Sequence, residues 1–181
     1  MGIQKVGIVG GGQMGGGVAE LTAKAGLATV VREVSPEAAD RSSGGIRNSL
    51  DRALERGKLD EAARASALGN LSFTTEMADL ADCDLVVEAV VESYELKAGI
   101  FRELDEVVAS PDAVLATNTS SIPIIDIAMN TGRPERVIGM HFFNPAPVMK
   151  LVEVIPSVRT DDEVTRAVTA FATDVLDKVV V

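Results

Sequence analysis

The 181-residue chain has very few of the residues that build disulfides and metal centres. Cys83 is its single cysteine and His141 its single histidine. A lone cysteine cannot form an intrachain disulfide, and one histidine with one cysteine falls short of the ligand sets that hold zinc. We therefore expect no metal site, and we expect any catalysis to depend on an organic cofactor or on ordinary side chains.

Long apolar runs and an excess of basic residues are also missing. No run reaches the roughly 20 residues needed to span a bilayer, and no leader with a cleavage site precedes the first apolar segment, which predicts a cytoplasmic protein. Lys and Arg total 17 against 27 Asp and Glu, so the formal net charge is −10. This charge repels nucleic acids and anionic membranes, so neither is expected as a partner, while a local basic pocket for a phosphorylated ligand stays compatible with it.

Apolar runs alternate with helical patterns along the chain, which is typical of βαβ units. The runs are apolar on consecutive residues, as in strands that helices cover on both faces. We predict a single Rossmann-like, doubly wound α/β domain over residues 1–181, with a mostly parallel sheet and helices on both faces. The predicted strands are 5–10, 28–33, 71–75, 84–90, 113–119, 136–143, 150–156 and 179–181, and the predicted helices are 13–26, 36–56, 93–109 and 122–130.

A last helix is predicted within TDDEVTRAVTAFATDVLDK, residues 160–178. Thr160 is suited to cap its N-terminus, and acidic residues follow in the first turn. Helical spacing places four apolar side chains on one buried face, namely Val164, Val168, Phe171 and Val175.

A glycine-rich segment, GIVGGGQMGGG at residues 7–17, ends the first predicted strand and opens the first predicted helix. Its Gly10-x-Gly12-x-x-Gly15 spacing allows a tight turn, close approach of a pyrophosphate and close helix packing. Glu33 ends the second predicted strand, where an acid accepts hydrogen bonds from the adenosine ribose. The alternative is a flexible turn without a ligand, because seven glycines in eleven residues make a chance match easy.

We predict NAD as the cofactor, because the charge of Glu33 would repel the 2′-phosphate of NADP. Arg32, beside it, leaves NADP open. The predicted cofactor contacts within the segment are Gly10, Gly11, Gly12, Gln13, Met14 and Gly15.

Polar residues follow two later strands. Ligands of open parallel sheets lie beyond the carboxyl ends of the strands, where LATNTSSIP brings Asn118 and Ser120, and GMHFFN brings His141. A histidine suits removal of an alcohol proton during hydride transfer, and a carboxylate such as Glu153 on the neighbouring strand would orient it. The alternatives are a core histidine, a solvent-facing glutamate and a Ser120 that caps the helix starting near Ile122.

Four segments together closely resemble the L-3-hydroxyacyl-CoA dehydrogenase family, and within it the bacterial 3-hydroxybutyryl-CoA dehydrogenases. They are GIVGGGQMGGG, DLVVEAVVESYELK, ATNTSSIPI and HFFNPAPVMKLVEV, and the resemblance extends from Lys5 to Val181. Related NAD-dependent families share the glycine segment but not HFFNP with a following LVE. The resemblance implies NAD-dependent oxidation of an L-3-hydroxyacyl-CoA, with short acyl chains such as hydroxybutyryl expected.

The resemblance also implies roles for matching residues. His141 would be the base in oxidation and the acid in reduction, with Glu153 as its partner, and Ser120 would hydrogen-bond near the substrate carbonyl and the nicotinamide. The implied NAD contacts are Glu92, Lys97 and Asn144, which join Asn118 at the same sheet edge. The implied coenzyme A contacts are Ser49 and Arg56, the latter where a lysine is often found; a solvated helix face is the alternative for both.

Family members add a helical domain that supplies an asparagine, closes the active site and forms most of the homodimer interface. The chain ends at Val181, so we expect that domain to be absent here and turnover by these residues alone to be weak. Two rival functions stay open, namely a non-catalytic NAD-binding module and a dehydrogenase of small hydroxy acids with the same fold.

Overall fold

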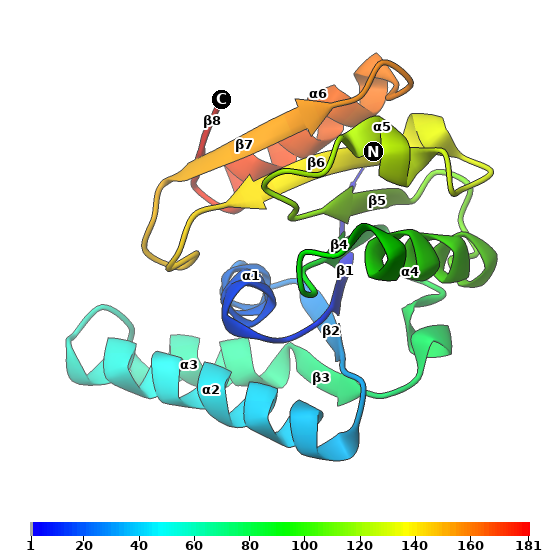
Figure 1. The fold of residues 1–181 in the computed structure, drawn as a ribbon. Helices are drawn as coiled ribbons and strands as arrows, with labels where there is room; N and C mark the ends of the chain where they lie inside the picture. Colours follow the sequence, from blue (N-terminus) through cyan, green and yellow to red (C-terminus); the bar gives the residue numbers. More distant parts are fainter. Residues whose placement is uncertain (1) are drawn as a thin grey trace.

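A computed structural model describes residues 2–181, which form an eight-stranded sheet in the order β3-β2-β1-β4-β5-β6-β7-β8 (Figure 1). The first six strands in chain order pair in parallel, β7 runs antiparallel to β6, and β8 runs parallel to β7. The order reverses at β1, which lies between β2 and β4. The fold class is therefore the predicted doubly wound α/β type, with a mostly parallel sheet.

The strands are β1 Lys5–Val9, β2 Ala28–Arg32, β3 Leu71–Thr74, β4 Leu85–Glu88, β5 Val114–Thr117, β6 Val137–Phe142, β7 Leu151–Pro156 and β8 Val179–Val180. The helices are α1 Gln13–Lys24, α2 Pro36–Glu55, α3 Glu61–Gly69, α4 Tyr94–Val107, α5 Ile124–Ala128 and α6 Asp162–Ala170, with short turns η1 Met77–Leu80, η2 Pro134–Arg136 and η3 Phe171–Val175. Every predicted strand, and every predicted helix, is present within a few residues of its expected bounds.

Helices cover both faces of the sheet and enclose two apolar cores. One core joins the strands to α1, α2 and α6, and includes Val18, Ile46 and Val168. The other joins them to α4, α5 and η1, and includes Phe101 and Ile127. Every residue of β4 and β5 is buried, which explains why both strands are apolar up to their last residues, Glu88 and Thr117.

Helix α3 was not predicted. Its sequence, EAARASALG, buries only Ala67, so it lacks the apolar period that marked the other helices. Its signals are the run of alanines and the cap, because the Asp60 carboxylate accepts a hydrogen bond from the Ala63 N–H at 2.7 Å.

Two details predicted for the last helix are wrong. Thr160 is not its cap: the helix begins after Asp161 without a side-chain cap, and the Thr160 hydroxyl donates to the carbonyl of Val137 at 2.7 Å. Val175 is 41% exposed, although Val164, Val168 and Phe171 are buried as predicted. The cause is η3, a π-helical turn closed by the Leu176 N–H on the Phe171 carbonyl at 3.2 Å, which turns Leu176 inward instead.

Among residues 2–181, no helix combines the length and the apolar character needed to cross a membrane. The described His, Cys, Asp and Glu side chains also form no group that could hold a metal ion. Cys83 lies in the core, and burial raises the pKa of its thiol to about 12.

Candidate active site

The glycine segment forms the turn between β1 and α1, and its backbone explains the glycine spacing. Gly10 has a φ of +90°, a conformation that other residues rarely adopt. A Cβ on Gly15 would lie 1.8 Å from the Gly10 carbonyl oxygen, so only glycine lets α1 approach the strand end. A Cβ on Gly12 would meet nothing within 4 Å, which leaves an open approach to the N-terminus of α1.

The N-terminus of α1 is built to receive an anion. Gly12 is its N-cap and supplies no side chain, and its first turn holds no acidic residue. The first N–H groups of the helix therefore point toward the cleft without a capping acceptor, and the helix dipole adds positive potential. A pyrophosphate fits this position by charge and by the space over Gly12.

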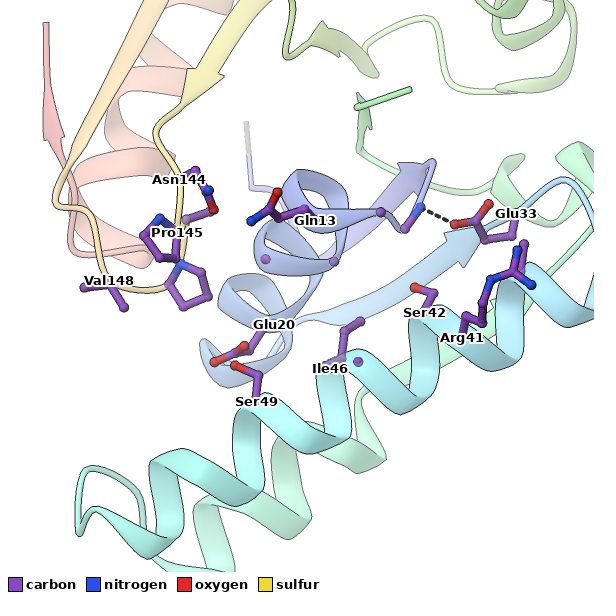
Figure 2. Close-up of a pocket in the computed structure, with 18 of the residues that line it drawn as sticks. Gln13, Glu20, Glu33, Arg41, Ser42, Ile46, Ser49, Asn144, Pro145 and Val148 are labelled. Carbon is purple, nitrogen blue, oxygen red and sulfur yellow. Dashed lines mark hydrogen bonds between the residues drawn. The ribbon is translucent and has the colours of Figure 1, made fainter. Parts of the chain in front are cut away.

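Glu33, for which a ribose contact was predicted, lies directly after β2 and beside the glycine turn. Its carboxylate accepts a hydrogen bond from the Gly11 N–H at 2.7 Å, which holds it beside the glycine turn (Figure 2). Arg32 points elsewhere, because its Nε donates to the Thr75 carbonyl at 3.2 Å. A basic residue that sequence reasoning missed, Arg41, projects from α2 near Glu33 and lines the same cleft.

The main cleft has a volume of about 750 Å³. Its walls are the glycine turn with α1, the inner face of α2, and the loop 144–148; Gln13 and Asn144 lie across it from each other (Figure 2). Ser49, one of the two residues predicted to contact coenzyme A, is part of the lining. Arg56 is the exposed C-cap of α2 and lies outside the lining, whereas Arg52, one turn nearer, is part of it.

His141 and Glu153 meet directly. They are register partners on the antiparallel strands β6 and β7, and Nδ1 of His141 lies 2.6 Å from the Glu153 carboxylate. A carboxylate at Nδ1 favours the tautomer that carries its hydrogen there, which leaves Nε2 free to accept a proton. The His141 side chain is 20% exposed, so neither a sealed core histidine nor a lone surface glutamate describes the pair.

A second cavity, of about 330 Å³, opens at His141. Its lining comes from the start of α1, the loops after β4 and β5, and the end of β6 with the loop that follows it. The lining residues are Met14, Ala89, Val90, Glu92, Asn118, Ser120, His141, Phe142, Phe143 and Asn144. Asn144 lines both cavities, so they adjoin at the end of β6. The Asn118 side chain also joins the two strand ends, because its oxygen accepts the Phe142 N–H at 2.9 Å.

Glu92 organises the Ser120 loop. Its carboxylate accepts hydrogen bonds from the Ser120 N–H at 3.0 Å and from the Thr119 hydroxyl at 2.5 Å. Burial alone would raise the pKa of Glu92, but these bonds and the Lys97 charge lower it to about 2. Ser120 is exposed and caps no helix, since α5 begins after Pro123 without a side-chain cap. Its hydroxyl makes only a long bond, to the Glu92 carboxylate at 3.5 Å, which a ligand in the cavity could replace.

Lys97 is almost fully buried, and its partner is a residue that sequence reasoning missed. Its Nζ lies 2.7 and 2.9 Å from the two oxygens of Glu88 and 3.4 Å from Glu92. Lys97 therefore stands behind the cavity lining, where its charge faces Glu92. Glu88 is a charged residue at the end of the otherwise apolar strand LVVE. That charge in a buried strand was the feature of the sequence that could have identified it.

A second buried lysine fixes the loop between the two cavities. Lys178 Nζ donates to the carbonyls of Ala146 and Met149, both at 2.7 Å, and burial lowers its pKa. This anchor was also missed, because the sequence places Lys178 in the polar end of a helix.

Comparison with known proteins identifies relatives of this chain. Residues 5–181 match the family model described as 3-hydroxyacyl-CoA dehydrogenase, NAD binding domain. A 3-hydroxybutyryl-CoA dehydrogenase from Mycobacterium tuberculosis is 50% identical over 179 residues, which are 99% of this chain and 63% of that protein. A probable 3-hydroxybutyryl-CoA dehydrogenase from Deinococcus radiodurans is 49% identical over 93% of the chain and 60% of its own length.

The solved structures agree with the sequence matches. The crystal structure of M. tuberculosis FadB2 superposes with a TM-score of 0.98 at 50% identity, over 100% of this chain and 64% of that one. The chain thus spans somewhat less than two thirds of the length of these three relatives.

Proposed function

Since the chain belongs to the 3-hydroxyacyl-CoA dehydrogenase family, matching its NAD-binding domain, we propose that the protein interconverts an L-3-hydroxyacyl-CoA and the 3-ketoacyl-CoA with NAD. The observation that carries this proposal is the His141–Glu153 pair at the cavity that adjoins the nucleotide cleft. Short acyl chains such as hydroxybutyryl belong to the same proposal, as do a cytoplasmic location and a homodimer.

NAD, when bound, supplies the nicotinamide ring that takes up or returns a hydride at carbon. The residues that would hold it follow the cleft in order. Glu33 would accept hydrogen bonds from the adenosine ribose, and the backbone from Gly10 to Gly15 would hold the pyrophosphate. At the nicotinamide end we assign Glu92, Asn118 and Asn144, all of which line the second cavity.

His141 would move the proton. In oxidation, Nε2 accepts the hydrogen of the 3-hydroxyl while the hydrogen on the same carbon leaves with its electron pair, and the C–O single bond becomes a carbonyl. The Glu153 carboxylate at Nδ1 stabilises the imidazolium that results. In reduction the same Nε2 returns the proton to the new alkoxide oxygen, so atoms and charge balance in both directions.

Ser120 would orient the reacting oxygen. Its loop is fixed by the bonds that Glu92 accepts, so the exposed hydroxyl has a defined position on the cavity wall. A hydroxyl there can donate to the substrate carbonyl and stabilise the charge that develops on it.

The coenzyme A portion would lie along α2. Ser49 and Arg52 line the cleft there, and Arg56 lies at the end of the same helix. A guanidinium is the natural partner of a phosphate, so a local basic strip is compatible with the acidic chain as a whole. Because Arg52 lines the cleft, we add it to Ser49 and Arg56 as a candidate contact.

A substrate comparison tests this proposal. The full-length protein is mixed with NADH and either acetoacetyl-CoA or free acetoacetate at equal concentration, and NADH loss is followed by absorbance. Rapid loss with the thioester and little with the free acid is expected, because only the thioester carries the nucleotide that α2 would bind. A protein that binds NADH but oxidises it with neither compound, or equally with both, would contradict the assignment.

A further inference from the structure

Glu88 is a fully buried carboxylate at the carboxyl end of β4, and it takes part in four short contacts. One oxygen accepts the Val90 N–H at 2.6 Å and lies 2.7 Å from Lys97 Nζ. The other accepts the Thr117 hydroxyl at 2.7 Å and lies 2.9 Å from the same Nζ. Each carboxylate oxygen of Glu88 therefore faces the Lys97 ammonium and one further donor, the Val90 N–H or the Thr117 hydroxyl.

Glu88 is one end of a cluster of three charges. Lys97 lies between Glu88, which is buried, and Glu92, which lines the second cavity. The formal charges of two carboxylates and one ammonium sum to one negative charge. On the described wall of that cavity the titratable side chains are Glu92 and His141, and the Glu153 carboxylate lies beside His141, so the cluster supplies part of the negative charge at this end of the cleft.

The charge of this cluster would affect the affinity for the two forms of the cofactor differently. Oxidised NAD has a positive nicotinamide ring and reduced NADH a neutral one, while the rest of the dinucleotide is the same in both. A negative charge near the ring therefore strengthens binding of the oxidised form alone.

We propose that Glu88 is a positioning residue that, through Lys97 and Glu92, keeps one net negative charge at the nicotinamide end and so sets the balance between NAD and NADH binding. The inference rests on the proposed function only for which end of the cleft receives the ring. A purely structural Glu88 would instead hold the Val90 backbone and the Thr117 side chain, and its replacement would affect both cofactor forms alike.

Dissociation constants for NAD and NADH, measured by titration calorimetry on the full-length protein without an acyl-CoA, separate these roles. Glu88→Gln keeps the size and most hydrogen bonds but removes the charge. We expect its Kd for NAD to rise about tenfold more than its Kd for NADH, because a unit charge in a partly dry site is worth about one power of ten. Equal rises in both constants would overturn the proposal.

Two further variants separate the effect of charge from the effect of a lost hydrogen bond. Thr117→Val removes a hydrogen bond from the same carboxylate without changing charge, and should leave the ratio of the two constants within about twofold of the original. Glu88→Gln with Lys97→Met restores the net charge of the cluster, and the ratio should return; a ratio that stays shifted contradicts the charge mechanism.

If Glu88→Gln does not fold, Glu92→Gln removes one unit of charge at the exposed end of the cluster and must weaken NAD relative to NADH, or the proposal is wrong. Acetoacetyl-CoA takes no part in these titrations. A protein that fails the substrate comparison but shows the expected ratio would therefore contradict the proposed reaction and leave this inference intact.

Discussion

Nδ1 of His141 and the Glu153 carboxylate lie 2.6 Å apart because their residues are register partners across β6 and β7. The pairing fixes both side chains on one face of the sheet, so the geometry does not depend on a flexible loop. It leaves Nε2 as the nitrogen that can exchange a proton with a ligand.

Replacing Glu153 by Gln tests this orientation. An amide can face Nδ1 but cannot stabilise an imidazolium, so we expect kcat for acetoacetyl-CoA reduction to fall by about 10²- to 10⁴-fold while the Kd for NADH is unchanged. Steady-state kinetics and titration calorimetry measure the two quantities. Glu163→Gln, on the exposed first turn of α6, is the matched control; a similar loss in both variants would contradict the role.

The structure of the glycine turn predicts different effects for two substitutions, one on cofactor affinity and one on stability. Gly12→Ala adds a methyl group to open space, so the melting temperature should hold while the Kd for NADH rises on the order of tenfold, because the methyl occupies the pyrophosphate approach. Gly15→Ala places Cβ 1.8 Å from the Gly10 oxygen and should lower the melting temperature by several degrees. Gly44→Ala, in α2 with open space around it, is the control. Unchanged NADH affinity in Gly12→Ala would show that the pyrophosphate does not bind over Gly12.

Glu33 should decide between NAD and NADP. Glu33→Ala is expected to raise the Kd for NADH about ten- to a hundredfold, because charge-assisted bonds to the ribose hydroxyls are lost. Asp40→Ala, an exposed acid of α2 outside the cleft lining, changes the charge equally and should have little effect. Tighter binding of NADPH than NADH by the unmodified protein would show that Arg41 or Arg32 controls the selection instead.

Acid should remove the contribution of Glu92 to stability. The folded pKa of about 2 lies below the ordinary value of 4.5, so the contribution is complete above about pH 4.5 and is lost as the pH falls toward 2. Urea unfolding should therefore show Glu92→Gln less stable than the original at pH 7, with a smaller gap at pH 3. A gap that is constant over this range would mean that the carboxylate is not held as described.

The sequence predicts the sheet well because its central strands, β1, β4, β5 and β6, are buried on both sides and therefore read as nearly continuous apolar runs. The prediction fails where the apolar pattern of the sequence does not follow the local structure. Helix α3 buries little and has almost no apolar period, and the π-helical turn at Phe171–Val175 shifts the inward face from Val175 to Leu176.

For the site, spacing identified the glycine turn, Glu33 and His141, each of which the fold brings to the same edge of the sheet. Contacts that depend on side-chain reach were not predictable. Arg56 follows Ser49 by two helical turns, roughly 10 Å along the axis, so it lies beyond the cleft although it shares the face. Glu88 and Lys178 bind through atoms far apart in sequence, which no periodicity reveals.

The most direct measurement is the turnover of His141→Ala with acetoacetyl-CoA and NADH, made beside a titration of the same variant with NADH. A proton carried by Nε2 predicts a fall in kcat of about 10²- to 10⁴-fold with the Kd for NADH within about threefold of the original. Turnover that survives the substitution would contradict the account.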